Sequence, residues 1–414
     1  MKNITNSQYF GLLILFILWP FGSFLIAIQH FYKKEAKLIV YMFIVLFGLT
    51  FVLGNELLDS YRYAEYFEYA ATLTINDLGL ILGTLFASEG SLDLARPLLS
   101  FIVSRFTSDY HIFFGVIAAI FGYFYLKSIN LVYQDYRKTR TYIALIFLLF
   151  FILIINPIFH INAYRFWTAT WIFFYGAHKL IILKEKKYLF LILLSITFHF
   201  SFIAPALVLI TYMILGNRNK LYIILIILSF FVSGIILNMF PQLISIFGEG
   251  IADKAGRYAN PERMQQLAEH AEWAKTQGKW YLYLPDKLTF YFLTFSFFYL
   301  HFKNKKIEKS AVQNNLYSFS LLLLAFANTI SFIPSMGRFK TLFLLFGTSS
   351  ILSVIAFVDL KKTRWLFFVG ILPFFLSLIT VLRLGVDLLN PLLFTMLPFP
   401  FLFDEVSIYQ WLFK

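Results

Sequence analysis

Two arginine residues begin long apolar segments, and their chemistry suits them to bind an anion. Arg165 lies in the segment YRFWTATWIFFYG, and Arg338 lies in GRFKTLFLLFG. A guanidinium at the centre of a membrane helix costs about 2.5–3.5 kcal/mol on insertion scales, so such a residue is usually functional. Its planar group stays charged and can donate two parallel hydrogen bonds to a phosphate. The two arginines therefore predict a buried site for a phosphate-bearing lipid or substrate, unless each side chain snorkels to the lipid headgroups.

A histidine inside another apolar segment is a third candidate. His199 lies in ITFHFSFIAP, shortly before Pro205. Proline interrupts the hydrogen bonding of a helix, and nearby polar groups can compensate inside a membrane protein. A histidine at such a break can bind a phosphate or act as a general base, because imidazole titrates near neutral pH. The alternative is a structural histidine whose ring nitrogens are satisfied within the fold.

Acidic and aromatic side chains outside the apolar segments suggest a carbohydrate site. The segment LLDSYRYAEYFEYA contains Asp59, Arg62 and Tyr63. Tyrosine rings can stack on sugar rings, and a carboxylate can accept hydrogen bonds from hydroxyl groups or deprotonate one of them. The glycine-rich segment GEGIADKAGRYANPE contains Arg257 and Tyr258 and could close as a lid. The alternatives are an interfacial belt of tyrosines and an ordinary surface loop.

Several other kinds of chemistry have no motif in this sequence. It has no Walker loop and no GxGxxG, HExxH or GxSxG pattern, and its histidines lack metal-ligand spacing. It also has no cysteine, which excludes disulfides and thiolate ligands. The formal net charge of +13 falls largely between apolar segments, where it sets orientation in a membrane. We therefore expect no metal, no cofactor and no nucleic-acid partner.

The elements that position these residues are expected to be membrane helices. Of the 414 residues, 60% are apolar and only 14% are charged, with a mean hydropathy of +0.74. Soluble domains of this size do not have such a composition. Apolar runs of about 18 residues or more are long enough to cross a bilayer. The expected spans are 9–30, 37–54, 110–127, 141–158, 163–183, 188–215, 220–240, 285–302, 313–333, 338–358 and 365–383, and a shorter run at 391–403 would make a twelfth.

Basic clusters between these segments predict the topology. Such clusters follow the spans at 9–30, 110–127 and 163–183 and precede those at 313–333 and 365–383. The positive-inside rule places all of them in the cytoplasm, so the N-terminus starts on the outer side. The segment 188–215 lies between two basic loops, KEKK and GNRNK, which conflicts with a single crossing. The conflict disappears if the chain enters the membrane and returns, reversing near His199; the alternative is one kinked helix.

This topology leaves two long loops on the outer face. The loop 55–109 ends in RPLLSFIVSRF, which is too short for a span and predicts an interfacial or re-entrant helix. The loop 241–284 contains an amphipathic helix with Asn260 as N-cap, Pro261 at the first position and Gly278 as the stop. The expected fold is all-α: a single transmembrane domain over residues 1–414, with about 11–12 helices, one broken pair and two elaborated outer loops.

The order of these motifs resembles a known family. The outer DSYRY segment, Arg165 with small residues behind it, the FHFS element around His199 and the late arginine of GRFKTLFL together resemble the EpsG-like, Wzy-type bacterial polysaccharide polymerases. The resemblance covers roughly residues 40–350. It implies a GT-C-like membrane enzyme that joins undecaprenyl-diphosphate-linked oligosaccharide repeat units on the outer face of the cytoplasmic membrane. It also implies that Arg165 and Arg338 bind the diphosphate, that His199 lies at the same site and that Asp59 is the outer acidic residue.

The resulting hypothesis is a metal-independent, inverting glycosyltransferase. Arg165 and Arg338, with Arg257, would hold the leaving diphosphate, and Asp59 or His199 would take the proton of the acceptor hydroxyl. Arg62, Tyr63 and Tyr258 would contact sugar. The expected partners are the donor and acceptor glycolipids, membrane lipids, a chain-length regulator and a flippase. The alternatives are a glycolipid flippase or transporter, which would also use arginines and broken helices, and a ligase of the O-antigen type, which would use another acceptor.

Overall fold

The computed structural model describes residues 6–53, 58–85, 93–136, 142–231, 265–266, 269, 272–273, 276–303, 310–331, 333, 335–355, 360–396 and 406–413. Within these residues all regular structure is helical, which confirms the expected all-α class. The α-helices are α1 (Asn6–Leu18), α2 (Pro20–Gln29), α3 (Lys34–Leu49), α4 (Asp59–Thr72), α5 (Ile75–Gly83), α6 (Ala95–Ser104), α7 (Tyr110–Tyr136), α8 (Tyr142–Ile155), α9 (Tyr164–Leu183), α10 (Leu189–Phe198), α11 (Ile203–Leu215), α15 (Leu284–Lys303), α16 (Ala311–Ile330), α17 (Lys340–Ile355), α18 (Leu360–Leu388) and α19 (Ile408–Phe413). Short 3-10 helices connect several of them: η1 (Ile158–Ala163), η2 (Lys186–Tyr188), η3 (Phe200–Phe202), η4 (Trp280–Leu282), η5 (Met336–Phe339) and η6 (Pro391–Phe394).

The length and composition of the helices identify a polytopic membrane protein. In the described ranges, four segments are long and apolar enough to cross a bilayer: Tyr110–Tyr133, Ile146–Leu183, Met336–Ile355 and Arg364–Leu388. Shorter apolar helices include Pro20–Gln29, Phe200–Leu215 and Asn219–Phe231. Helices α15 and α16 coincide with the spans expected at 285–302 and 313–333. The total of eleven or twelve crossings, and the assignment of the whole chain to one domain, stay predictions.

Besides the broken pair predicted at 188–215, two of the expected spans are not single helices. The run at 9–30 is divided between α1 and α2, because Pro20 cannot continue the hydrogen bonding of α1 and instead begins α2. The Ser23 hydroxyl donates to the Leu12 carbonyl over 2.8 Å, which ties the two helices together. The run at 391–403 begins with the short η6. The prediction of a twelfth membrane helix is therefore wrong for residues 391–396, the part of this run that the structure describes. Asn390 caps this turn by accepting the Leu392 N–H.

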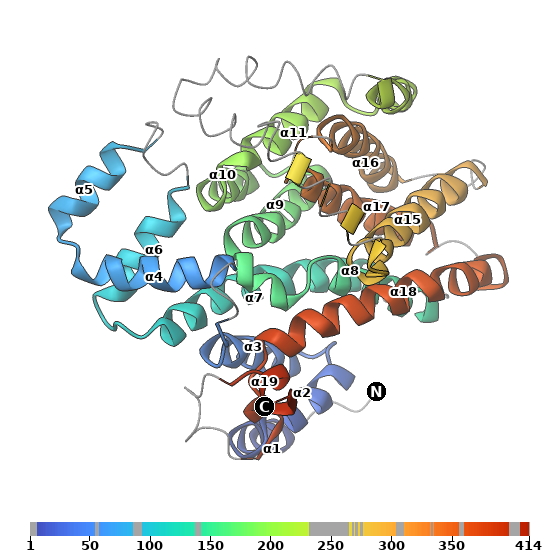
Figure 1. The fold of residues 1–414 in the computed structure, drawn as a ribbon. Helices are drawn as coiled ribbons and strands as arrows, with labels where there is room; N and C mark the ends of the chain where they lie inside the picture. Colours follow the sequence, from blue (N-terminus) through green and yellow to red (C-terminus); the bar gives the residue numbers. More distant parts are fainter. Residues whose placement is uncertain are drawn as a thin grey trace.

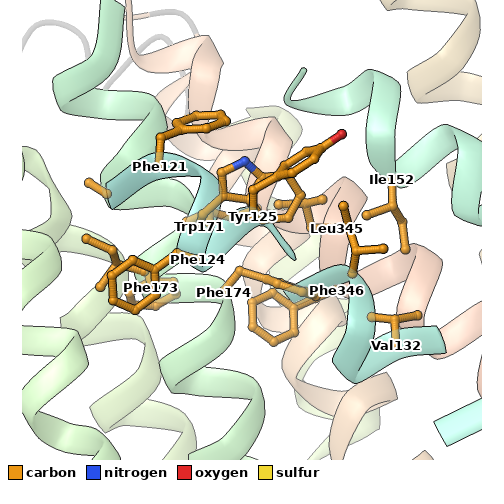
Figure 2. Close-up of a cluster of buried hydrophobic side chains, with 14 of the residues drawn as sticks. Phe121, Phe124, Tyr125, Val132, Ile152, Trp171, Phe173, Phe174, Leu345 and Phe346 are labelled. Atoms are coloured by element: carbon orange, nitrogen blue, oxygen red, sulfur yellow. The ribbon is translucent and has the colours of Figure 1, made fainter. Parts of the chain in front are cut away.

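Helices α7, α8, α9 and α17 form the centre of the bundle (Figure 1). Figure 2 shows Tyr125 of α7, Trp171 and Phe174 of α9, and Phe346 of α17 in one buried cluster. The rings of Tyr125 and Trp171 meet edge to face with centroids 5.2 Å apart. In the most apolar 18-residue window of Met336–Ile355, which contains α17, 89% of the residues are buried. In the corresponding window of α18, only 22% of the residues are buried. Helix α17 is therefore an interior helix, and α18 presents most of its surface outward.

Helices α3 and α7 approach each other closely through glycine. A Cβ atom added to Gly48 would lie 2.3 Å from the Ala118 Cβ and 2.5 Å from the Phe114 carbonyl oxygen. Gly115 of α7 lies against Leu49 at the same crossing. Small residues of this kind let two membrane helices pack backbone to backbone, where dispersion contacts replace the missing hydrophobic driving force. This crossing fixes α3 against the central helices.

The chain reverses at His199, as the basic loops predicted. Helix α10 packs along α9, whereas α11 packs along α16. At the far end of α11, the Asn217 amide donates to the Asn315 side chain over 2.9 Å, and the Asn315 amide donates to the Ile181 carbonyl over 3.4 Å. The GNRNK segment therefore lies at the same end of the bundle as the C-terminus of α9 and the KEKK loop. The chain therefore leaves and returns to one end of the bundle and reverses at the other, and its re-entry into a membrane stays a prediction.

Helices α4, α5 and α6 form an arm beside the bundle, at the left of Figure 1. The expected helix in RPLLSFIVSRF is α6. Just after it, Arg105 donates to the carbonyl oxygens of Leu73 and Ala70 over 2.9 and 2.7 Å. These contacts satisfy the C-terminal carbonyls of α4 and lock α6 against it. The arm is joined to the bundle through the stacked rings of Phe67 and Phe113, 4.7 Å apart.

The outer loop at 241–284 is described only near its end. Asn260 and Pro261, the expected start of its amphipathic helix, lie outside the described residues. Gly278 has a φ of +63°, a left-handed conformation that favours glycine. Residues 277–278 form a turn after the helical Thr276, so the predicted stop at Gly278 is confirmed.

Candidate functional site

Arg165 occupies the second position of α9 and is held by two partners from the outer arm. Its Nη1 lies 2.6 Å from the Asp93 Oδ2, and its Nε donates to the Tyr63 hydroxyl over 3.0 Å. The Asp93 side chain is 7% exposed and that of Arg165 is 25% exposed, so this ion pair is largely removed from solvent. The Arg165 side chain thus points into the protein and does not snorkel to headgroups.

Asp93 connects the arm to the chain reversal. While Oδ2 accepts from Arg165, Oδ1 accepts the backbone N–H of Phe200 over 2.8 Å. One carboxylate therefore fixes the start of α9, the residue after His199 and the segment leading into α6. This role of Asp93 was not predicted from the sequence. The one local feature that marks Asp93 in the sequence is its position directly before a short apolar helix. Other carboxylates of the loop 55–109 have comparable sequence neighbours, so this feature does not distinguish Asp93 from them.

His199 lies between α10 and η3 in extended backbone, where the helix breaks. Its Nδ1 is 2.7 Å from the Ser201 hydroxyl. Its ring meets the Phe166 ring edge to face at 5.4 Å, and it lies within electrostatic range of Asp93, Arg165 and Arg338. The structure thus places this histidine within electrostatic range of both arginines.

Arg338 reaches the same place from η5. The preceding Ser335 has a φ of +66°, and its carbonyl oxygen accepts the Arg338 Nε–H over 2.9 Å. The guanidinium carbon lies 4.4 Å from the centre of the Phe166 ring, a cation–π distance. His199 and Arg338 therefore both contact the Phe166 ring, and Phe166 directly follows Arg165 in the sequence.

A cavity of about 380 Å³ opens beside Arg338. Arg165 does not line it, so the two arginines do not share this hollow. The walls come from the ends of α8, α9, α15, α17 and α18. Its polar lining residues are His160, Trp167, Asp286, Thr289, Arg338, Lys340, Thr341, Ser377 and Thr380. A volume of this size is typical of small-molecule sites.

The other predicted site residues are placed differently. Asp59 and Arg62 form an ion pair of 2.8 Å on the exposed side of α4, away from the direct contacts of His199. Tyr63 is buried, and burial raises its pKa, so the phenol stays neutral while its oxygen accepts from Arg165. Tyr63 thus orients Arg165 in this structure. Arg257 and Tyr258 lie outside the described residues.

Comparison with known proteins identifies the family. A model of the EpsG family matches residues 38–394, which is most of the chain. The chain belongs to the EpsG family. No curated protein and no solved structure matches it. Membership indicates a membrane protein of the polysaccharide polymerase type.

In this EpsG-family protein the arrangement around Phe166 suits an anionic substrate. Arg338 contributes a positive charge at the wall of a cavity, and the Arg165–Asp93 pair fixes a second guanidinium nearby. His199 adds a group that can exchange a proton. The described residues contain no cluster of three or more histidine, aspartate or glutamate side chains that could hold a metal ion. The Arg338 guanidinium and the Lys340 ammonium, which line the cavity, are groups that can stabilise negative charge.

Proposed function

We propose that this protein is an inverting glycosyltransferase that polymerises undecaprenyl-diphosphate-linked oligosaccharide repeat units on the outer face of the cytoplasmic membrane. The observation that carries the proposal is that His199 and Arg338 meet at the Phe166 ring beside a cavity, with Arg165 within electrostatic range of His199. These residues come from three separate parts of the sequence. Their proximity suits a diphosphate leaving group together with a proton acceptor.

In the proposed reaction an acceptor hydroxyl oxygen attacks the anomeric carbon of the donor. The bond from that carbon to the diphosphate oxygen breaks, the configuration inverts, and undecaprenyl diphosphate leaves with its added negative charge. Arg338 stabilises this charge directly, and Arg165 does so through Nη2, because its Nη1 and Nε are bound by Asp93 and Tyr63. Arg257 is a further expected diphosphate ligand.

The proton of the acceptor hydroxyl passes to a base, and His199 fits this role better than Asp59. His199 lies beside both arginines, whereas Asp59 pairs with Arg62 on the exposed surface of α4. The Ser201 hydroxyl, 2.7 Å from Nδ1, holds the imidazole ring in place and leaves Nε2 for the acceptor. Asp59, Arg62 and Tyr258 remain candidates for contacts with more distant sugars.

The proposal is tested by polymerisation in vitro with purified protein, lipid-linked repeat units and a chelator. Arg165→Ala and Arg338→Ala should each slow chain growth by about 100-fold, the usual scale for losing one oxyanion-stabilising group. The matched control is Arg364→Ala, which removes an exposed arginine at the start of the described span of α18. Full chain growth by Arg338→Ala would refute the leaving-group role.

The products of the same assay separate the alternatives. A ladder of repeat units supports a polymerase. Transfer of the glycan to a different acceptor would indicate a ligase, and translocation with unchanged glycan length would indicate a flippase. A chain-length regulator and a flippase are the expected protein partners in the cell.

A further inference from the structure

The cavity beside Arg338 contains charged residues that the proposed reaction does not use. Lys340, at the start of α17, lines it two residues after Arg338, and Asp286 lines it from the first turn of α15. Lys340 is half-buried, and Asp286 is exposed. The cavity therefore combines positive groups on one wall with a negative group on another.

These charges do not neutralise each other. Among the described residues no ion pair joins Lys340 to Asp286, although both line the same hollow. The Lys340 ammonium lies 5.2 Å from the centre of the Phe290 ring, and Leu344 lines the same wall. A lysine against an apolar wall is costly without an anionic partner, which makes it a candidate for ligand binding.

Hydroxyl groups line a further part of the cavity. The Thr289 and Ser377 hydroxyls are hydrogen-bonded to each other over 2.6 Å and connect α15 with α18. Thr380 donates to the Tyr281 carbonyl over 3.3 Å, which attaches η4 to α18. A row of hydroxyls beside a carboxylate is the kind of surface that binds the hydroxyl groups of a sugar.

We infer that this cavity binds the head of a lipid-linked saccharide, with Lys340 and Arg338 on the phosphate groups and Asp286, Thr289 and Ser377 on the first sugar. Lysine binds phosphate as a point charge and arginine as a planar fork, so the two are complementary on a diphosphate. The inference rests on the proposed function for the choice of a saccharide carrier. It adds Lys340 and Asp286 to the site as binding residues.

Binding is measured on the purified full-length protein in detergent by titration calorimetry with two probes. One probe is geranyl diphosphate, and the other carries a single hexose on the same diphosphate. Lys340→Gln should weaken both probes by about tenfold, as expected for losing a charge-assisted contact. Lys340→Arg should restore most of the affinity. Asp286→Asn should weaken only the hexose-bearing probe.

Lys287→Gln is the control for long-range charge, because Lys287 is exposed, lies within electrostatic range of Lys340 and does not line the cavity. It should weaken both probes much less than Lys340→Gln does. Wild-type affinity of Lys340→Gln for both probes would overturn the inference. So would equal weakening by Lys287→Gln, because the effect would then reflect long-range charge alone.

A second measurement uses the unchanged protein and does not depend on the folding of a variant. Geranyl diphosphate should protect Lys340 from an amine-acetylating reagent, read by mass spectrometry, while Lys287 reacts at its original rate. Unprotected Lys340 at a saturating probe concentration would reject the inference. Neither measurement requires chain growth, so intact binding without polymerisation would reject the proposed reaction and leave this site standing.

Discussion

At the scale of single residues, Phe166 and Asp93 organise the candidate site. Phe166 presents its face to Arg338, and the His199 ring meets it edge to face. Asp93 holds Arg165 through one oxygen and the Phe200 N–H through the other. Removing the negative charge of Asp93 is energetically costly, because the positive charge of Arg165 would then have no negative partner in a place with little solvent.

Replacing Asp93 should therefore destabilise the protein as well as the site. Asp93→Asn keeps the shape and the contact to Phe200 but removes the negative charge beside Arg165. We expect a loss of about 2 kcal/mol in the free energy of unfolding, the scale of a hydrogen bond to a charged group. Thermal unfolding in detergent measures it.

The control for this prediction is Asp59→Asn, which breaks an exposed ion pair. Such pairs contribute less than about 0.5 kcal/mol to the free energy of unfolding when they lie within a helix. The unfolding midpoint of the Asp59→Asn variant should therefore hardly change. Equal midpoints for Asp93→Asn and the unchanged protein would show that Asp93 is not a structural partner of Arg165.

At the scale of elements, helix ends and close crossings set the geometry of the site. The cavity lies where α9, α15 and α17 begin and where α8 ends. Its position therefore depends on how the helices are stacked, and close crossings such as that of α3 with α7 limit their movement. Gly48 is at the centre of that crossing.

A methyl group at Gly48 should separate α3 from α7. Gly48→Ala would bring its Cβ within 2.5 Å of a backbone carbonyl, which cannot move independently of its helix. We expect a destabilisation of about 1–3 kcal/mol, as for overpacked cores. Gly79→Ala in α5 is the matched control, because a Cβ there meets nothing within 4 Å. It should be neutral or slightly stabilising, since alanine favours helix. A neutral Gly48→Ala would contradict the tight crossing.

At the scale of the whole molecule, the basic loops and the candidate site lie at opposite ends of the bundle. The KEKK and GNRNK segments share one end, and the reversal at His199 reaches the other, next to the arm of α4 to α6. From the positive-inside rule we predict that these loops lie in the cytoplasm and the site on the outer side.

Cysteine labelling checks this arrangement without background, because the chain has no cysteine. Glu68→Cys, on the exposed surface of α4, should react with a membrane-impermeant maleimide in intact cells. Lys186→Cys and Arg218→Cys, exposed at the other end, should react only after permeabilisation. Labelling of Arg218→Cys in intact cells would mean that the re-entrant pair does not return to the cytoplasmic side.

The sequence was informative where a signal is local. A charge in an apolar run marks Arg165 and Arg338, and a proline with nearby polar groups marks the break at His199. Asp93 could not be selected, because its partners lie 72 and 107 residues away and their proximity exists only in the folded chain. Lys340 and Asp286 were missed for the same reason. Asp59 was chosen for its tyrosine neighbours, yet the amphipathic pattern of α4 places it on the exposed side and puts Tyr63 against Arg165.

The sparse packing of α18 has a consequence for how a carrier with a long isoprenoid tail would be accommodated. This helix supplies Ser377 and Thr380 to the cavity, yet little of its apolar surface is covered by protein. A ligand in the cavity is therefore separated from the surrounding acyl chains by one helix, a barrier about 10 Å thick. If the proposed carrier binds here, its tail need pass only the width of α18 to reach the acyl chains, so most of the tail's length would place no demand on the interior volume of the protein.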